Sequence, residues 1–173
     1  MSPQPTWVVE PLNPSKHNRS HFSCGNGALD RYLKKQASQD IKRKLAKVFV
    51  ACQPRSSNVL GYYTLSAASF NKGSLPLEKG KKLPYADVPA VLIGRLAVDQ
   101  TWQGKKLGEF LLIDACRRVV ETSQSTLAIN AIVVHAKDKK AKGFYMKYGF
   151  IPFVDESLHL FIPTKTIEGA YKF

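Results

Sequence analysis

The chain has 173 residues, 44% of them hydrophobic, a length that suits one domain with a single core. Its 26 Lys and Arg residues against 13 Asp and Glu residues give a formal net charge of +13, which favours a polyanionic partner. The apolar runs are too short to span a membrane, and no basic start or apolar signal core opens the chain. We therefore expect a cytoplasmic protein without a membrane partner.

Cysteine usage argues against two further classes of protein. Cys24, Cys52 and Cys116 are odd in number, far apart and outside any Cys-x-x-Cys pair. This spacing is unlike both a disulfide framework and a zinc site, so we expect three reduced thiols and no bound metal.

The amino-terminal part of the chain predicts a strand, a loop and a helical region. Thr6 to Glu10 suits a first strand and Pro11 to Ser20 a loop, after which Asn26 is a suitable helix N-cap. The apolar face expected for the two helical pieces that follow consists of Leu29, Tyr32, Leu33, Ile41 and Leu45.

Two β-rich runs come next, at Val48 to Cys52 and Val59 to Ala67, separated by the sequence Gln-Pro-Arg-Ser-Ser-Asn. Because this separator has the composition of a turn, the two runs predict an antiparallel hairpin. Lys72 to Pro84 is rich in lysine, glycine and proline and predicts a loop.

The centre of the chain combines a strand, a polar loop and a helix. Val91 to Val98 is almost entirely apolar and predicts a strand buried on both faces, and Asp99 to Gly108 is polar with two glycines. The apolar residues at helical spacing from Gly108 onward are Leu111, Leu112, Ala115, Cys116 and Val119. A glycine loop at a helix N-terminus is suited to a phosphate or pyrophosphate, and Lys105 and Lys106 add positive charge. In many βα units, however, glycine only turns the chain.

After this helix, Ala128 to His135 predicts another strand, Lys139 to Lys147 a short helix, and Ile151 to Phe153 with Leu158 to Ile162 a closing pair of strands. The elements do not repeat as strand–helix–strand units. Their order predicts a mixed α+β fold.

Positive charge also gathers in two segments outside the central loop. Between Arg31 and Lys47 only Asp40 opposes the basic residues, and between Lys137 and Lys147 only Asp138 does. Such a cluster by itself often forms an ordinary solvated surface. Two clusters together with a basic central loop favour RNA as the partner.

The order Gln103-Gly-Lys-Lys-Leu-Gly108 resembles the acetyl-CoA loop of the GNAT family of N-acetyltransferases, Gln/Arg-x-x-Gly-x-Gly/Ala. Lys106 departs from that pattern, because the family usually has glycine or alanine there. The resemblance implies acetyl-CoA as co-substrate and a GNAT fold, in which helices flank a central, mostly antiparallel twisted sheet with one splayed strand pair.

The resemblance covers nearly the whole chain. Its other segments are Phe22 to Asp30, Gly94 to Val98, His135 to Asp138, and Phe144-Tyr-x-x-Tyr-Gly-Phe150. Together they are similar to the tRNA-acetylating toxin branch of the family. This similarity implies a toxin that acetylates the α-amine of aminoacyl-tRNA and blocks translation, a cognate ribbon-helix-helix antitoxin that neutralises it, and a homodimer.

The resemblance also implies roles for single residues. The backbone of Leu96 to Val98 is expected to pair with the pantetheine arm, with the Val98 N–H facing the thioester oxygen. Tyr145 matches the family tyrosine that protonates the coenzyme A thiolate, although a core position also suits it. Asn130 is either a pantetheine ligand or a structural amide. The expected cofactor-binding residues are Leu96, Ala97, Val98, Gln103, Gly104, Lys105, Lys106, Leu107, Gly108, Asn130 and Tyr145.

The acceptor is predicted from a missing carboxylate. None lies between Val91 and Val98, where lysine-modifying relatives commonly carry a glutamate base, and Asp99 is the nearest candidate. An α-amine with a pKa near ~8 needs a base less than a lysine with a pKa near ~10.4, so an α-amino acceptor is favoured. His135 and His159 are candidate bases, but a lone histidine on an apolar strand is more often structural. The residues expected to contact nucleic acid are Lys34, Lys35, Lys42, Arg43, Arg95, Lys105, Lys137 and Lys140.

Two other functions stay open from the sequence. One is an N-acetyltransferase of protein or small-molecule amines. The other is a nucleic-acid-binding module that keeps the fold without turnover, for which Lys106 in the glycine position is the best argument.

Overall fold

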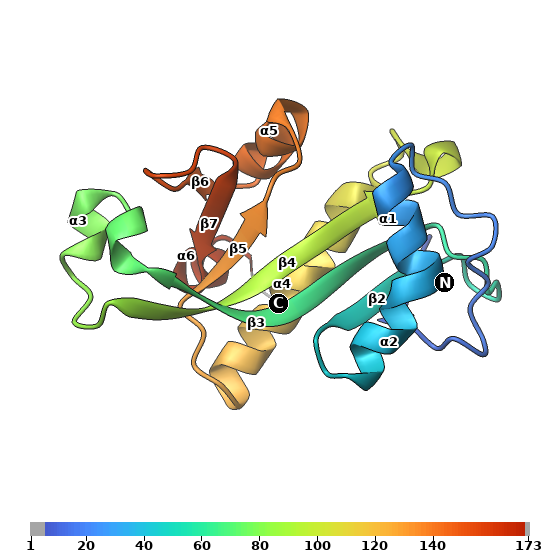
Figure 1. Ribbon diagram of the computed structural model, residues 1–173, viewed down its shortest axis with the longest axis horizontal. Coiled ribbons are helices and arrows are strands. Elements are labelled where there is room, and N and C mark those ends of the chain that lie inside the picture. The colour runs from blue at the N-terminus through green and yellow to red at the C-terminus, as the bar shows by residue number, and fades with distance from the viewer. Residues whose placement is uncertain (1–5, 172–173) are drawn as a thin grey trace, which may run out of the picture. The chain divides into compact units, whose positions relative to one another are not determined.

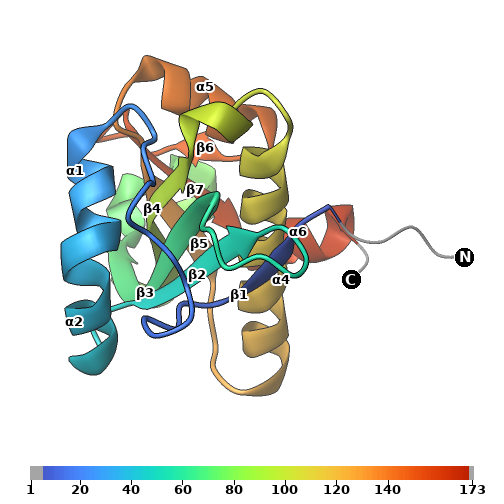
Figure 2. The same cartoon turned by 90° about the vertical axis from the view of Figure 1, so that its right-hand side faces the viewer.

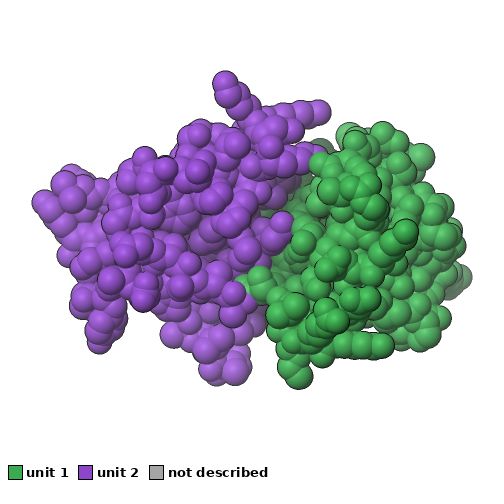
Figure 3. Space-filling model, in the orientation of Figure 1, with its two compact units in different colours: residues 1–66, 95–115 green, residues 67–94, 116–173 purple. Residues whose placement is uncertain are grey.

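The computed structural model describes residues 6–171, and Figure 1 shows their helices and strands. The chain forms two compact units, coloured separately in Figure 3. The first consists of residues 1–66 and 95–115, and the second of residues 67–94 and 116–173. That the chain is a single domain stays a prediction.

In the part of the chain that the structure describes, seven strands follow the order β1-β2-β3-β4-β5-β7-β6 in one sheet. Their bounds are β1 Val8–Pro11, β2 Lys47–Cys52, β3 Gly61–Asn71, β4 Asp87–Val98, β5 Ala131–His135, β6 Ile151–Pro152 and β7 His159–Pro163. The pairs β1–β2, β2–β3, β5–β7 and β6–β7 are antiparallel, whereas β4 and β5 are parallel. The sheet is therefore mixed and mostly antiparallel, as predicted.

The helices are α1 Gly27–Arg31, α2 Ala37–Lys42, α3 Leu77–Gly80, α4 Leu107–Ser125, α5 Lys139–Lys147 and α6 Thr164–Ala170. A π-helical turn, Tyr32–Gln36, joins α1 to α2, and 3₁₀ turns lie at Lys72–Ser74 and Gln100–Trp102. The helix predicted at Lys139 to Lys147 has the observed bounds of α5.

In the first unit, the α1–π–α2 region covers one face of β2 and β3, and the first half of α4 lies on the opposite face (Figures 1 and 2). The helical region begins as predicted, because the Asn26 side chain accepts hydrogen bonds from the N–H groups of Ala28 and Leu29. On the α4 side, Gly61 permits close packing. A Cβ there would lie 2.9 Å from Leu111 Cδ1 and 3.0 Å from the Ala97 backbone oxygen, and so a larger residue would force the Leu111 side chain or the β4 backbone to shift.

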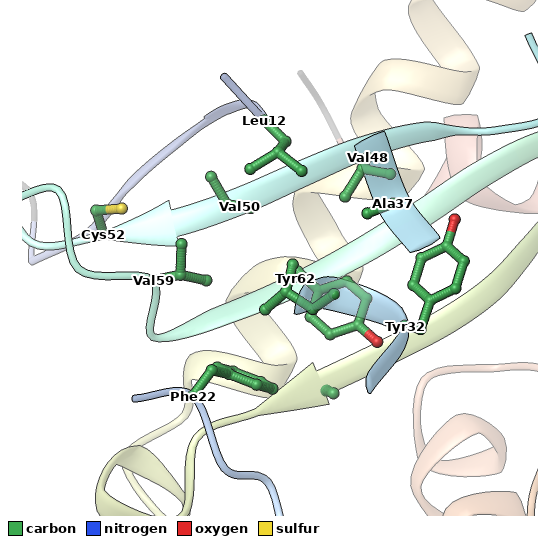
Figure 4. Close-up of a cluster of buried hydrophobic side chains, with 11 residues drawn as sticks. Leu12, Phe22, Tyr32, Ala37, Val48, Val50, Cys52, Val59 and Tyr62 are labelled. Carbon is green, nitrogen blue, oxygen red and sulfur yellow. The ribbon is translucent and has the colours of Figure 1, made fainter. Parts of the chain in front are cut away.

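The core of the first unit lies between the helical region and the strands (Figure 4). Tyr32 and Leu33 are buried there, as predicted, together with Val48, Val50 and Tyr62 from the strands. These side chains exclude water from the face of the sheet, the main favourable term in folding.

Leu45 was predicted to extend this apolar face, and the structure shows that prediction to be wrong. Its side chain is 59% exposed. The physical reason lies in the end of α2: Lys44 takes a left-handed φ of 58°, which turns the chain out of the helix before Leu45.

In the second unit, β4 pairs with β5 from Ala90–Ala131 to Ile93–Val134. The closing strand pair is confirmed in β6 and β7, although β7 also pairs with β5 and lies between the two. The core of this unit contains Leu75, Ala90, Val133, Phe153 and Phe161.

Several predicted bounds in the chain need correction. The first strand is Val8–Pro11 and not Thr6 to Glu10, and β5 begins at Ala131 and not at Ala128. The segment predicted as a plain loop at Lys72 to Pro84 contains a 3₁₀ turn and α3, and α6 was not predicted.

The largest correction concerns β4. It begins at Asp87, before the predicted Val91, and it is not buried on both faces: Ile93 and Ala97 are buried, whereas Gly94 is exposed. Among residues 6–171, the register of β4 with β5 stops at Ile93, and so the strand beyond that point is partly open on one edge.

The sequence predicts no disulfide, no membrane-spanning helix and no metal site. Cys24, Cys52 and Cys116 form no disulfide in the structure. Within residues 6–171, no helix is long and apolar enough to cross a membrane. In the same range, no group of three or more His, Cys, Asp or Glu side chains is placed to hold a metal ion.

Candidate functional site

The site on the first unit begins at the carboxyl end of β4. β4 continues to Val98, five residues beyond the last β4–β5 pair at Ile93. The backbone of Leu96 and Val98 therefore has hydrogen-bonding groups on one edge that β5 does not use, and such groups need a partner when water is excluded. A ligand with its own amide groups can pair with this edge as an added strand would.

Gln103 holds the end of β4 in place. Its side-chain nitrogen donates hydrogen bonds of 2.9 Å to the backbone oxygens of Val98 and Cys24. Predicted as a cofactor-binding residue, Gln103 thus connects β4 to the loop before α1. Gln103 thus fixes the backbone positions of Val98 and Cys24 at the site.

Asp99, the nearest candidate base in the sequence, is buried and fully engaged. Its carboxylate accepts hydrogen bonds from the Ser23 N–H and from the N–H and hydroxyl of Thr101. Burial acts to raise the pKa of Asp99, but these hydrogen bonds outweigh it and hold the pKa below its usual value. A weakly basic carboxylate with these bonds fixes the 3₁₀ turn and is a poor proton acceptor.

The loop and helix that follow have the geometry of an anion site. α4 begins at Leu107, one residue before the predicted Gly108, and the Phe110 N–H bonds to the Lys106 oxygen. The N–H groups of Leu107 and Gly108 lie in the first turn, where no intrahelical acceptor exists. Gly104 has a φ of +78° and open space around its missing Cβ, so a ligand can approach its backbone closely.

The two lysines of this loop differ in conformation. Lys105 places its ammonium 4.7 Å from the centre of the Trp102 ring, a cation–π contact. Lys106 adopts a φ of 69°, the left-handed region that favours glycine. The family preference for glycine at this position therefore has a conformational reason that Lys106 does not satisfy.

We predict that Lys106→Gly stabilises the protein by about 0.5–1 kcal/mol. The relief of a left-handed lysine, worth about 1–2 kcal/mol, exceeds the greater unfolded-state entropy of glycine, about 0.5–1 kcal/mol. Urea unfolding measures the change. Lys105→Gly is the matched control, since it removes the same charge from the same loop at a residue without positive φ and should destabilise. Equal effects of the two variants would contradict the conformational argument.

Tyr145 lies on α5 in the second unit, in edge-to-face contact with the rings of Phe144 and Phe150. The side chain is 8% exposed, and burial raises its pKa to about 12. No described residue forms a hydrogen bond with its hydroxyl. Tyr145 is thus a buried phenol that keeps its proton at neutral pH and has no protein acceptor for it among residues 6–171.

Asn130 precedes the first residue of β5, at the end of the strand opposite His135. Its backbone oxygen accepts hydrogen bonds from the N–H and hydroxyl of Thr164. The β4–β5 register ends at Val134, four residues or about 13 Å further along β5 at about 3.3 Å per residue. This placement lends no support to the predicted pantetheine contact, and the contact of Asn130 stays a prediction.

The predicted nucleic-acid-binding residues are almost all exposed. The exposed ones are Lys34, Lys35, Lys42, Arg43 and Lys105 in the first unit, and Lys137 and Lys140 in the second. Arg95 differs, because it is half-buried with its guanidinium carbon 3.5 Å from the centre of the Tyr32 ring. No described residue accepts a hydrogen bond from that guanidinium, so its donors are available to a ligand.

The contacts that hold the Tyr32 ring against Arg95 were not predicted from the sequence. The Tyr32 hydroxyl donates a 2.8 Å hydrogen bond to Asp40, and the Tyr32 and Tyr62 rings are stacked. Burial and that bond raise the pKa of Tyr32 to about 12, although the charge of Arg95 lowers it. Tyr32 begins the π-helical turn, a feature often found at functional sites, and no sequence signal marks such a turn.

In the first unit, the open strand edge and the glycine loop at a helix N-terminus suit a ligand with amide and phosphate groups, as a coenzyme A thioester has. In the second unit, Tyr145 is a buried phenol that keeps its proton. The family model for the acetyltransferase (GNAT) domain matches residues 44–152, and the chain belongs to that family. It is an N-acetyltransferase that uses acetyl-CoA.

The names of individual relatives describe an activity more narrowly than the family does. The chain is 36% identical over 144 residues to the tRNA-acetylating toxin of Mycobacterium tuberculosis. The aligned residues cover 83% of this chain and 84% of that toxin. It is similar to AtaT complexed with acetyl-methionyl-tRNAfMet, with a TM-score of 0.89, 34% identity and coverage of 96% and 99% of the two chains. A tyrosine-to-phenylalanine variant of AtaT bound to the C-terminus of the antitoxin AtaR and acetyl-CoA has a TM-score of 0.84, 29% identity and coverage of 98% and 100%.

Proposed function

We propose that this acetyltransferase is a toxin that acetylates the α-amine of aminoacyl-tRNA, blocks translation in the cytoplasm and is neutralised by a cognate antitoxin. The observation that carries the proposal is the site's lack of a basic carboxylate together with a net charge of +13. Asp99 is engaged in hydrogen bonds, so an acceptor that is readily neutral suits the site better than a lysine. The charge suits an acceptor carried on RNA.

In the proposed site, acetyl-CoA supplies the activated acetyl group as a thioester. The backbone of Leu96 to Val98 pairs with the pantetheine arm, and the Val98 N–H stabilises the oxyanion that develops on the thioester carbonyl. The first-turn N–H groups of α4, with Gly104 beside them, bind the pyrophosphate, which the helix dipole and Lys105 also favour.

The reaction transfers acetyl from sulfur to nitrogen. The neutral α-amine attacks the thioester carbon, a C–N bond forms and the C–S bond breaks. The ammonium proton must leave the nitrogen, and the thiolate must receive a proton. Tyr145 supplies the second proton, since a phenol with a raised pKa remains protonated throughout the neutral range.

The relatives support the acceptor and the partner. A relative of the chain is named a tRNA-acetylating toxin, and AtaT has been solved with an acetyl-methionyl-tRNA. AtaT has also been solved with the C-terminus of an antitoxin. For this chain we propose the same kind of acceptor and the same kind of partner. The proposed antitoxin is a ribbon-helix-helix protein with an acidic, amphipathic tail. The proposed active species is a homodimer. Co-purification with the product of an adjacent gene tests the partner, and full activity within that complex would count against it.

We predict that the KM for aminoacyl-tRNA rises steeply with salt, whereas the KM for acetyl-CoA changes little. Counterion release makes each lost phosphate contact worth about one unit of the salt slope. The triple variant of Lys34, Lys35 and Lys42 to alanine should therefore flatten the slope by about two to three units. Steady-state kinetics from low to moderate salt measure this.

The matched control removes the same charge elsewhere. Alanine replacements of Lys79, Lys81 and Lys82, which are exposed but outside the predicted contacts, should leave the salt slope close to that of the wild type. Equal flattening by the two triple variants would show that net charge, and not a tRNA contact on the α1–π–α2 region, controls the affinity.

A further inference from the structure

The connection between β3 and β4 carries exposed apolar side chains in the second unit. It folds into the 3₁₀ turn Lys72–Ser74 and α3 (Figure 1). Among the large hydrophobic residues within 6–171, Tyr85, Leu77 and Val154 are the most exposed, at 75%, 72% and 63%. Tyr85 and Leu77 belong to this connection, and Val154 lies two residues after β6. Exposed apolar side chains that gather in one place commonly mark a surface for binding another protein.

Leu77 and Val154 line one groove of about 470 Å³, which we call the α3 groove. Leu75, which is buried, adds a third aliphatic side chain to the lining. The other lining residues are Lys72, Gly73, Gly80 and Lys81. The α3 groove is therefore apolar, with lysines among its lining residues.

The walls of the α3 groove are tied to one another. The Val154 N–H donates a 2.9 Å hydrogen bond to the Ser74 backbone oxygen, and the Ser74 hydroxyl donates a 2.7 Å hydrogen bond to Asp155. A Cβ on Gly80 would lie 2.8 Å from the Lys72 backbone oxygen, so glycine lets α3 pack closely against the 3₁₀ turn. The groove is thus formed before a ligand arrives, which reduces the ordering cost of binding.

Positive charge surrounds the α3 groove. Between Lys72 and Lys82, only Glu78 opposes four lysines, and Lys79, Lys81 and Lys82 are exposed. A second copy of the chain would bring the same lysines to an isologous interface, which disfavours a dimer here. RNA bases stack on aromatic rings or on arginine, and neither lines this groove among the described residues. An acidic peptide segment with apolar side chains suits both the lining and the charge.

We propose that the α3 groove is the docking site for the acidic, amphipathic tail of the antitoxin. This assignment rests on the proposed function, because an antitoxin with such a tail is part of it. The tail folds on binding as an amphipathic helix. Its apolar side chains pack against Leu75, Leu77 and Val154, and its carboxylates face the lysines around the groove.

Leu77→Asp tests the apolar contact. Leu77 is exposed and is the first residue of α3, where a negative charge is favourable, so the variant should fold and keep its acetyltransferase activity. The affinity for the purified product of the adjacent gene, measured by calorimetry, should fall by about 30-fold or more, as for a lost apolar anchor. Leu127→Asp is the matched control, because Leu127 is an exposed leucine of the second unit outside the α3 groove. It should bind like the wild type.

The lysines give a second readout that general destabilisation would not reproduce. The triple variant of Lys79, Lys81 and Lys82 to alanine should slow association with the antitoxin on the order of 10-fold at low salt and much less at high salt. The triple variant of Lys34, Lys35 and Lys42 to alanine removes the same charge from the first unit and should associate at nearly the wild-type rate. The reverse pattern would place the tail on the α1–π–α2 region and overturn the proposal.

The outcomes distinguish this docking site from the proposed function. If the antitoxin binds the wild type and Leu77→Asp equally tightly, the docking site is wrong and the proposed function stands. If the product of the adjacent gene does not bind the wild type, the antitoxin of the proposed function and the docking site both fail. A loss of tRNA affinity in Leu77→Asp, or a change from dimer to monomer in sedimentation, would assign the groove to RNA or to a second copy and also overturn the proposal.

Discussion

Replacement of Gly108 by glutamate is expected to abolish acetyl-CoA binding, with a loss of affinity of about 10³-fold or more. Gly108 is the second residue of α4, in the turn whose N–H groups we assign to the pyrophosphate. A carboxylate there repels a diphosphate at close range. Calorimetric titration with acetyl-CoA measures the effect, and unchanged affinity would place the phosphates elsewhere.

Gly108→Glu should lose affinity for acetyl-CoA without losing stability. A negative charge in the first turn of a helix is favourable by about 0.3–1 kcal/mol, so Gly108→Glu should retain its stability. Gly108→Gln is the matched control for size. It should lose much less affinity than Gly108→Glu, because it adds nearly the same volume without the charge. Equal losses would mean that bulk, and not charge, closes the site.

Tyr145→Phe is expected to lower kcat by roughly 10²-fold or more while acetyl-CoA affinity stays nearly intact, the size expected for a lost general acid. The change removes only the hydroxyl, and the ring contacts with Phe144 and Phe150 do not depend on it. Because no described residue bonds to that hydroxyl, little stability should be lost. Near-normal turnover would remove Tyr145 from the mechanism.

Tyr148→Phe is the matched control for Tyr145→Phe. Tyr148 follows the last residue of α5 and contacts Phe144 in the same aromatic cluster, so its replacement should leave turnover within a few-fold of the wild type. The pH profile supplies a further check. Since burial raises the pKa of Tyr145 to about 12, ionisation of this phenol should cause no fall in rate below about pH 10.

The sequence identifies the elements whose signals are local. α5 has the bounds that its pattern predicts, and Asn26 caps the first helix as its residue type indicates. The hairpin of β2 and β3 is equally local, since turn residues separate its strands. The family motif likewise predicts the order of strand, loop and helix at the centre of the chain.

Features that depend on distant partners could not be predicted. Gln103 bonds to Cys24, which is 79 positions away in the sequence, and Asp99 bonds to Ser23. Single-sequence patterns report residue type and periodicity and contain nothing about such contacts. The two-sided burial predicted for β4 failed for the same reason, because burial depends on where β5 stops pairing.

Backbone conformation is a second source of error. Lys44, in the left-handed conformation, turns the chain out of the helical region before Leu45. Lys106 has the same conformation at the position where the family usually has glycine. Neither can be predicted from lysine, which rarely adopts this conformation. The stacked pair of His135 and His159 also needed the structure, because the register of β5 with β7 brings the two together.

Transfer of labelled acetyl from acetyl-CoA to tRNA tests the central claim most directly. Purified protein is given charged tRNA, the same tRNA without its amino acid, and a lysine-containing protein, each at matched concentration. The account predicts label only in the charged tRNA, released by mild alkali as an N-acetyl amino acid. Label entering uncharged tRNA or protein lysines at comparable rates would contradict it.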